Sequence, residues 1–279
     1  MSDRLAALLA HFSIHVSTFH AGAICGIHSS AHSDGLGQLH LLTEGTVEVR
    51  HGTAAALRLQ EPTVLLYPRP LARSFVTDDR ASATLVCADL AFHGGAANPI
   101  LAALPAFVAM PLSKVPDAAP VFSMLRGEAS GGHCGRKVVM DSLCQVVVVQ
   151  LLRELMEQRK IEGGMLAGLG HPLLAKAIVA MHNQPEAEWT LDTMADTAGM
   201  SRTTFAETFK DTVGITPGAY LQTWRIGLAQ KGVKAGRALK LVAIEVGYGS
   251  EGALSRAFRS QTGRSPREWK KEVLHHEAA

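Results

Sequence analysis

An internal repeat in the last third of the chain constrains its fold more strongly than any other feature of the sequence. Residues 191–200 match residues 239–248 position by position, at an offset of 48. Beyond them the offset becomes 49, and apolar residues, glycines and prolines continue to match. The matched pairs there are Phe205 with Leu254, Phe209 with Phe258, Gly214 with Gly263, Pro217 with Pro266 and Tyr220 with Trp269. Because both copies repeat the same anchors and chain breaks, we expect two copies of one small helical unit.

Each copy predicts two short helices joined by a tight turn. Gly199 and Gly247 follow the first helix, where glycine in the left-handed conformation often ends a helix. Ser201 and Ser250 stand at good N-cap positions for the second helix. This order is a helix-turn-helix unit, whose second helix enters the major groove in DNA-binding proteins. The alternative is an ordinary helical bundle with two similar hairpins, and the matched caps, glycines and prolines argue against it.

The second helix of each unit is predicted to present its first turn outward, because apolar residues four apart anchor the opposite face. Arg202 is suited to bind a guanine through two hydrogen bonds. Gly252 and Ala253 offer little side chain, so the second unit is expected to position more than it reads. The predicted base contacts are Arg202, Thr203, Thr204, Glu207, Glu251, Gly252, Ala253 and Arg256. The predicted phosphate contacts are Ser201, Lys210, Arg225, Ser250, Arg259, Arg264 and Arg267.

The stretches Ala198-Gly-Met-Ser-Arg through Pro217, and Val246-Gly-Tyr-Gly-Ser through Pro266, resemble the AraC/XylS family of transcription regulators. The resemblance covers roughly residues 171–275. It implies a domain of seven helices that binds double-stranded DNA, with a long helix over about 217–232 placing the two units in successive major grooves. It also makes RNA polymerase a partner to consider. Leu254 stands where the family usually has an aromatic residue, which we expect to change packing and not function.

The first half of the chain has a different pattern. From about residue 20 to 90, short alternating segments such as Thr46–Arg50 are separated by turn signals every eight to twelve residues, which predicts a small antiparallel barrel or sandwich. Helices are predicted at 99–104, 118–128 and 135–159. The fold class is therefore α+β. The expected domains are residues 1–160 (helical part about 98–160), a glycine-rich linker over 161–170, and an all-α domain over 171–279.

Residues of about 5–110 resemble the cupin-type sensor domains attached to many such regulators. The resemblance rests on Leu39-His40-Leu41-x-x-Glu44-Gly45, on Tyr67-Pro68-Arg69-Pro70 and on Ala97-Asn98-Pro99-Ile100-Leu101. It implies a cupin-like β-barrel that binds an effector or mediates dimerisation.

Metal-binding cupins use a His-x-His…Glu arrangement and a later histidine. Here Gln38 replaces the first histidine, Arg73 falls where the last is expected, and His40 and Glu44 remain. One histidine and one carboxylate are too few for a firm transition-metal site, although His28, His32 and His93 are further histidines that a fold can bring near. We therefore predict no metal or other cofactor, and take His40, Glu44 and Arg73 as effector candidates. A cupin enzyme or a metal-dependent sensor is the alternative.

Cys25 and Cys87 are candidates for a redox signal, because thiols at similar places occur in cupin-type sensors of this family and two barrel strands can bring such residues together. The alternative is that both are small buried apolar residues. Cys134 and Cys144 are interpreted as structural. The helix over 135–159 carries an apolar stripe, which either packs on its own barrel or, as is common in this family, pairs with a second copy in a homodimer.

Charge alone does not indicate a DNA partner. The formal net charge is +2, and fourteen Lys and Arg against eleven Asp and Glu follow Gly170. With 47% apolar and 19% charged residues, the composition excludes a disordered chain. Asp3 and Arg4 interrupt any signal-peptide core, and no apolar run approaches a membrane span. We therefore expect a cytoplasmic regulator without membrane contact or enzyme activity, which responds to a small molecule or a redox signal.

Overall fold

The computed structural model describes residues 3–29, 35–52, 55–77, 82–94, 98–115, 117–158 and 163–277. The chain divides into two compact units. One consists of Ser13–Gly95 and Ala103–Ile161, and is called the sensor unit after the sensor domains that it is expected to resemble. The other consists of Met1–Phe12, Ala96–Ala102 and Glu162–Ala279, and is called the DNA-binding unit after its expected role. The division therefore differs from the expected one, since the first residues of the chain belong with the last hundred or so.

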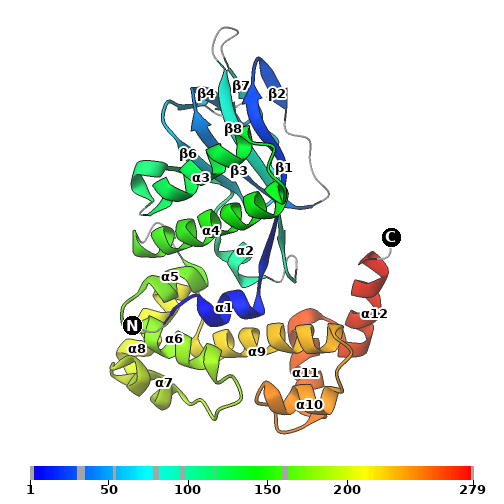
Figure 1. Cartoon of the computed structure of the whole chain (residues 1–279). Coiled ribbons are helices and arrows are strands. Elements are labelled where there is room, and N and C mark those ends of the chain that lie inside the picture. The colour runs from blue at the N-terminus through cyan, green and yellow to red at the C-terminus, as the bar shows by residue number, and fades with distance from the viewer. Residues whose placement is uncertain are drawn as a thin grey trace. The chain divides into compact units, whose positions relative to one another are not determined.

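Two antiparallel sheets form the body of the sensor unit (Figure 1). The strands are β1 Ile14–Ile24, β2 Ile27–Ser29, β3 Gly37–Glu44, β4 Val47–Arg50, β5 Leu57–Leu59, β6 Thr63–Tyr67, β7 Ser74–Val76, β8 Ala83–Phe92 and β9 Val108–Pro111. The five-stranded sheet has the order β1-β8-β3-β6-β9, and the four-stranded sheet the order β2-β7-β4-β5. Buried side chains of both sheets, among them Leu42, Val49, Leu65, Phe75 and Leu85, form one apolar core. The predicted barrel or sandwich is confirmed, and it starts earlier and ends later than expected.

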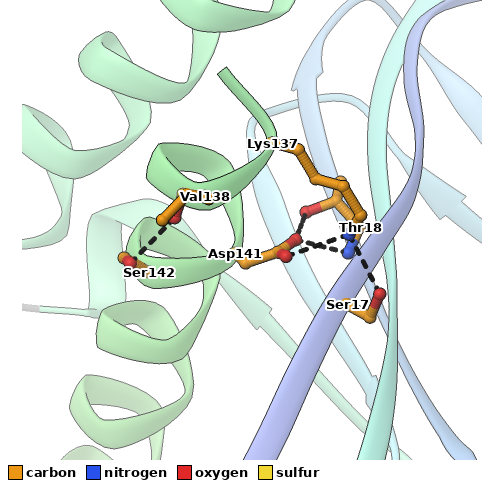
Figure 2. A network of polar contacts seen from close by, with 6 residues as sticks. All are labelled: Ser17, Thr18, Lys137, Val138, Asp141 and Ser142. Carbon is orange, nitrogen blue, oxygen red and sulfur yellow. Dashed lines mark hydrogen bonds and ion pairs between the residues drawn. The ribbon is translucent and has the colours of Figure 1, made fainter. Parts of the chain in front are cut away.

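The helices α3 (Ala118–Ser130) and α4 (Arg136–Glu157) complete the sensor unit, close to the predicted ranges. The buried face of α4 packs on β1. Figure 2 shows the polar contact that fixes this packing. Asp141 Oδ1 accepts hydrogen bonds from the Thr18 amide (2.6 Å) and the Thr18 hydroxyl (2.5 Å), and Lys137 Nζ lies 2.9 Å from Asp141 Oδ2 and 3.0 Å from Ser17 Oγ. The β1–β8 register shifts between Thr18 and His20, so Asp141 holds β1 at its bulge.

Helices build the DNA-binding unit. They are α1 Ala6–His11, α5 Gly164–Gly170, α6 Leu174–Asn183, α7 Leu191–Ala198, α8 Arg202–Val213, α9 Pro217–Lys234, α10 Leu239–Glu245, α11 Glu251–Thr262 and α12 Pro266–Glu277, while α2 Pro99–Ala103 lies at the boundary with the sensor unit. The seven helices from α6 to α12 are the number that the family resemblance implies. The repeat is visible as α7 with α8 and α10 with α11, and α9 is the long connecting helix.

The helix α1 packs against α6 and α9, far from it in sequence. Leu8 is fully buried, and the Phe12 ring lies 5.2 Å from the Trp224 ring, centroid to centroid. Arg4 Nη1 donates to the Leu169 carbonyl oxygen at 2.9 Å, and Lys231 Nζ donates to the Ala10 carbonyl oxygen at 3.2 Å. These contacts make the start of the chain part of the DNA-binding unit.

The predicted linker over 161–170 is wrong for the residues that the structure describes there. Residues 163–170 include the helix α5, whose Met165, Leu166 and Leu169 are buried. The glycines that suggested a linker serve packing instead. A Cβ on Gly168 would lie 2.6 Å from Ile178 Cδ1 and 2.9 Å from Val213 Cγ2, so α5 approaches α6 and α8 closely because this residue has no side chain.

Within the described ranges, no single helix has the length and apolar composition to cross a membrane. The helices α5 and α6 pass that test only when taken together, and they meet at an angle of 116°.

Candidate nucleic-acid interface

The helix α8 is fixed at its start and along one face. The Ser201 hydroxyl accepts a hydrogen bond from the Thr204 amide, and Gly199 has φ of 71°, the left-handed conformation expected after α7. Phe205 and Phe209 are fully buried, and Phe209 packs edge-on against Tyr220 at 5.4 Å. The opposite face is therefore presented to solvent. The predicted base contacts Arg202, Thr203, Thr204 and Glu207 are all exposed on it.

Arg202 has a partner in the free protein. Its Nη1 atom lies 3.4 Å from Asp192 Oδ2 of α7, and both side chains are more than half exposed, at 64% and 62%. An ion pair so open to water contributes little free energy, commonly less than about 1 kcal/mol. The guanidinium is thus pre-oriented near the start of the helix, and exchanging the carboxylate for a base edge costs little.

The helix α11 repeats this construction with different chemistry. The Ser250 hydroxyl accepts from the Ala253 amide at 3.1 Å, Gly247 has φ of 80°, and Leu254 and Phe258 are fully buried. Leu254, which stands where the first copy has the aromatic Phe205, therefore still anchors its helix. A Cβ on Gly252 would lie 3.6 Å from Arg256 Nη1, so the exposed Arg256 guanidinium lies beside the first turn of α11. The second unit therefore also has a long side chain where base contacts are predicted.

Six of the seven predicted phosphate contacts fall into three groups. Lys210, Arg259 and Arg267 are exposed on the helices α8, α11 and α12. Arg264 is half exposed and forms an ion pair with Glu272. The hydroxyls of Ser201 and Ser250 cap their helices, so they mark helix N-termini whose amides favour an anion.

Arg225 does not fit the predicted phosphate contact, and the structure corrects this assignment. Its Nε donates to the Pro185 carbonyl oxygen at 2.7 Å and its Nη2 to the Ala187 carbonyl oxygen at 2.9 Å. A Cβ on Gly247 would lie 2.7 Å from Arg225 Nη2, so the guanidinium also packs against the turn of the second unit. Burial lowers the pKa of Arg225. Arg225 therefore ties the α6–α7 loop to that turn.

The helix α9 carries one unit at each end. Its first half contacts α7 and α8, and Ile226, Ala229 and neighbouring residues form a core with α10 and α11. Its 18 residues span roughly 27 Å at 1.5 Å per residue. Successive major grooves on one face of DNA lie about 34 Å apart. A rigid helix of this length is suited to hold α8 and α11 at such a separation.

In the sensor unit, Gln38, His40 and Arg73 meet inside the barrel. Arg73 Nη2 bonds to Gln38 Oε1 and lies 2.6 Å from His40 Nε2, and its guanidinium carbon is 3.9 Å from the centre of the Tyr67 ring. Gln38 Nε2 donates to Asp89 Oδ1 at 2.9 Å. Burial, together with Arg73 and His20, holds the pKa of His40 well below its usual range. The neutral imidazole therefore accepts a hydrogen bond from the buried guanidinium.

These residues do not fit a cupin metal ion, because a guanidinium already bonds the histidine that would be a ligand. Glu44 is exposed, and its Oε1 atom lies 3.3 Å from Arg126 Nη1. His28 bonds the Cys25 carbonyl oxygen, and His32 lies outside the described residues. The residues that the structure describes contain no group of three or more His, Cys, Asp or Glu placed to hold a metal.

The strand register does not bring Cys25 and Cys87, the two candidates for a redox signal, within reach of each other. Cys87 pairs with His20, whereas Cys25 follows Ile24, which pairs with Ala83. Five residues along a strand separate the two Cα positions by roughly 16 Å, well beyond the ~7 Å limit for a disulfide. Cys25 is exposed, whereas Cys87 is buried and burial raises its pKa to about 12. Cys144 is buried as expected of a structural residue, and Cys134 is exposed.

Comparison with known proteins matches the two halves of the chain to two families. Residues 3–157 match the family described as Cupin, and residues 194–272 match the family described as Helix-turn-helix domain. A putative AraC-like transcription regulator of Streptomyces lividans is 41% identical over 136 residues, which are 48% of this chain and 45% of that protein. The chain thus aligns with about half the length of the first relatives it matches.

Two further proteins are similar to the chain over different lengths. RclR of Escherichia coli K12, described as an RCS-specific HTH-type transcriptional activator, is 29% identical over 242 residues, 84% of each chain. The solved DNA-binding domain of AdpA, in complex with a target DNA, is 30% identical, covers 38% of this chain and 95% of that one, and has a TM-score of 0.35.

The cupin match spans more than half of the chain, and the repeat, its caps and its anchors account for the helix-turn-helix match. This chain belongs to the AraC/XylS family of DNA-binding transcription regulators, with a cupin domain ahead of its two helix-turn-helix units.

Proposed function

We propose that this protein regulates transcription by sequence-specific binding to double-stranded DNA, and that it works by binding and not by catalysis. One observation carries the proposal. The helices α8 and α11 are capped and anchored in the same way at the two ends of α9, and each presents its first turn to solvent. The first recognition helix offers Arg202, Thr203, Thr204 and Glu207 to base edges, and the second offers Arg256 with Glu251, Gly252 and Ala253 beside it.

Selection of bound sequences from random DNA, followed by footprinting, tests this proposal. We expect two conserved blocks about one helical turn apart, roughly 10 base pairs centre to centre. Arg202→Ala should relax the preference in one block and Arg256→Ala in the other. If the protein binds DNA but enriches no sequence, it binds DNA nonspecifically and the proposed sequence-specific regulation is wrong.

A second copy of the chain is the proposed partner of α4. The buried side of this helix, with Met140, Cys144 and Val147, packs on its own sheet. Val138, Val139 and Val146 are 70%, 36% and 43% exposed on the same helix. Both interpretations of the stripe are therefore compatible, because its apolar residues cover more than one face. Val139 and Val146 are seven residues apart, a spacing that suits pairing of two helices.

Light scattering of the purified protein tests the dimer. Val146→Asp should shift the mass from two chains to one. Ile27→Asp is the matched control, since Ile27 is 69% exposed in β2 and away from α4. A dimer that survives the α4 substitution, or a monomeric parent protein, would remove this proposal.

We also propose that a chemical signal changes DNA binding. RclR is described as RCS-specific, and for this chain a small molecule is better supported than a disulfide, because Cys25 and Cys87 lie apart and Cys87 is buried. If oxidant alters operator affinity in the parent and not in Cys25→Ser or Cys87→Ser, the redox signal is the correct one.

The place of action follows from the proposed target. A regulator of bacterial genes acts on the chromosome, so we assign it to the cytoplasm, with RNA polymerase as the partner through which an activator would work. Transcription in vitro with a promoter that carries the selected operator distinguishes activation from repression.

A further inference from the structure

The turn that follows α10 lies against the loop that leads into the first helix-turn-helix unit. Gly247 of this turn has φ of 80°, and a Cβ on it would lie 2.8 Å from the Pro185 carbonyl oxygen and 2.7 Å from Arg225 Nη2. Pro185 stands between α6 and α7, whereas Arg225 lies in the middle of α9. Three separate segments therefore meet here, and a residue without a side chain leaves room for them.

Among the described residues, the equivalent turn of the first unit makes no such contact. Gly199 matches Gly247 in the repeat and has nearly the same conformation, with φ of 71°. In the part of the chain that the structure describes, nothing lies within 4 Å of a Cβ placed on Gly199. Both glycines end a helix, but of the two it is Gly247 that also faces the other unit. The contact is therefore not a requirement of the repeated turn, and it belongs to the junction between the units.

The guanidinium of Arg225 completes this contact from α9. Its Nε donates to the Pro185 carbonyl oxygen at 2.7 Å, and its Nη2 donates to the Ala187 carbonyl oxygen at 2.9 Å. The guanidinium carbon also lies 5.9 Å from the centre of the Tyr248 ring, next to Gly247. Because a guanidinium is planar and its donors point in fixed directions, it holds the two carbonyl oxygens in one geometry. Arg225 thus bonds the loop of the first unit and packs on the turn of the second.

Beside this contact, a cavity separates the two units. It has a volume of about 570 Å³, and its lining includes Asn183 and Pro185 on one side and Val242 and Val246 on the other. Among the described residues, α7 and α8 pack mainly on α5, α6 and α9, whereas α10 and α11 pack mainly on α9 and α12. The Arg225 contact therefore has a large share in fixing how the two units are oriented about α9.

We propose that Arg225 is a positioning residue which, together with Gly247, sets the separation and rotation of α8 and α11 and thereby the spacing of the two DNA blocks that the protein accepts. The consequence for DNA rests on the proposed function, because both helices must bind base edges. One base pair changes the separation of two blocks by about 3.4 Å and their rotation by about 35°. A fixed junction therefore accepts one spacing, whereas a loose junction also accepts neighbouring ones.

Binding to operators whose two blocks are one base pair closer together or further apart tests this role. We expect the parent protein to discriminate against both altered operators by at least about tenfold, and Arg225→Gln by about threefold or less. Lys234→Gln is the matched control, because it removes a positive charge near the end of the same helix. This variant should keep the discrimination of the parent.

Arg225→Lys separates positioning from charge. An ammonium group keeps the positive charge and lacks the planar fork that spans both carbonyl oxygens. Lysine should therefore restore the spacing discrimination only in part. If Arg225 contacted a phosphate instead, lysine would restore the affinity, and Arg225→Gln would weaken binding to all three spacings equally. An unchanged spacing preference in Arg225→Gln overturns the proposal.

The two turn glycines give a matched pair of variants that keep Arg225. Gly247→Ala places a Cβ against the guanidinium and the Pro185 oxygen, whereas Gly199→Ala forces alanine into the same left-handed conformation with open space around it. Both variants should lose some stability. Gly247→Ala alone should loosen the spacing preference, and equal preferences in the two variants would contradict a role for this contact.

The distance between α8 and α11 can also be measured without DNA. Spin labels at Lys210→Cys and Arg259→Cys, two exposed positions that match in the repeat, report it by pulsed electron paramagnetic resonance once the exposed Cys25 and Cys134 are replaced by serine. We expect a narrow distance distribution with Arg225 in place, and a broad or shifted one in Arg225→Gln. An unchanged distribution overturns the proposal. If the distribution broadens in a protein that selects no DNA sequence, the proposed function has failed and the positioning role has not.

Discussion

We expect Arg202 to exchange its carboxylate partner for a base edge when α8 binds DNA. In the free protein its guanidinium faces Asp192 across an exposed distance of 3.4 Å. A guanine edge offers two acceptors in a fixed geometry, and one such contact contributes about 1–3 kcal/mol of discrimination. Arg202→Ala should therefore weaken operator binding by about that amount in fluorescence anisotropy. Arg153→Ala, an exposed arginine of α4 in the sensor unit, is the control and should leave the affinity unchanged.

Arg225 and Arg259 should respond to substitution in opposite ways. Arg225 donates to two backbone oxygens, and hydrogen bonds of a charged group contribute roughly 1.5–3 kcal/mol. Arg225→Ala should lower the free energy of unfolding by about that amount, measured by urea denaturation. Arg259→Ala should leave stability unchanged and reduce the slope of log affinity against log salt by roughly 1, as expected for a lost phosphate contact. A reduced salt slope for Arg225→Ala with unchanged stability would restore its predicted role.

At the residue scale, sequence spacing predicts the position of a side chain well when that position depends on the periodicity of a single helix. The caps Ser201 and Ser250 and the four aromatic or leucine anchors follow from spacing within one helix, and the structure places them as predicted. The role of Arg225 depends on a loop forty residues earlier, and the distance between Cys25 and Cys87 depends on strand register. Neither relation is encoded in local pattern.

Among the elements, α5 depends on one residue for its close packing. A side chain at Gly168 would overlap Ile178 and Val213, so Gly168→Val should destabilise the fold by about 1–3 kcal/mol through overpacking. Gly218→Ala in α9 is the matched control, because nothing lies within 4 Å of its Cβ position and alanine favours a helix. Chemical denaturation should show loss for the first variant and a gain of up to about 1 kcal/mol for the second. Equal stability of the two variants would contradict the packing described for α5.

The elements also show why sequence predicts some helices and misses others. The long helix α4 carries enough periodic residues to be recognised, whereas α9 is expected from the family resemblance. The observed ends of both lie within a few residues of the expected ones. The glycines of α5 suggest a linker because local pattern cannot show that Met165, Leu166 and Leu169 have a surface to cover. The same holds for α1, whose packing partners on α6 and α9 lie far away along the chain.

At the scale of the whole molecule, buried histidines make stability depend on pH. Burial, aided by His11, lowers the pKa of His182 to about 3 from an ordinary value of 6.5. Above pH 6.5 both the folded and the unfolded chain keep this group neutral, so its full contribution to stability is present. As pH falls toward 3, the unfolded chain binds the proton first, and the free energy of unfolding drops by up to about 1.4 kcal/mol per pH unit.

His182→Phe isolates this effect, because the ring that stacks on Trp224 at 3.6 Å is kept while the titrating group is removed. Between pH 7 and 4.5 the parent should lose stability faster than the variant in urea denaturation. Parallel pH profiles for the two proteins would show that His182 does not titrate as described.

The docking of α1 decides which segments of this protein can be exchanged with a relative. When a sensor domain precedes a DNA-binding domain, a chimera of two regulators is usually designed with one junction, which in this chain would lie near residue 162. Here such a splice would separate α1 and Phe12 from α6 and Trp224, against which they pack, and leave both against residues of another protein. The DNA-binding unit is therefore made of separate stretches of the chain. A functional chimera must take residues 3–12 and 163–277 from the same parent protein.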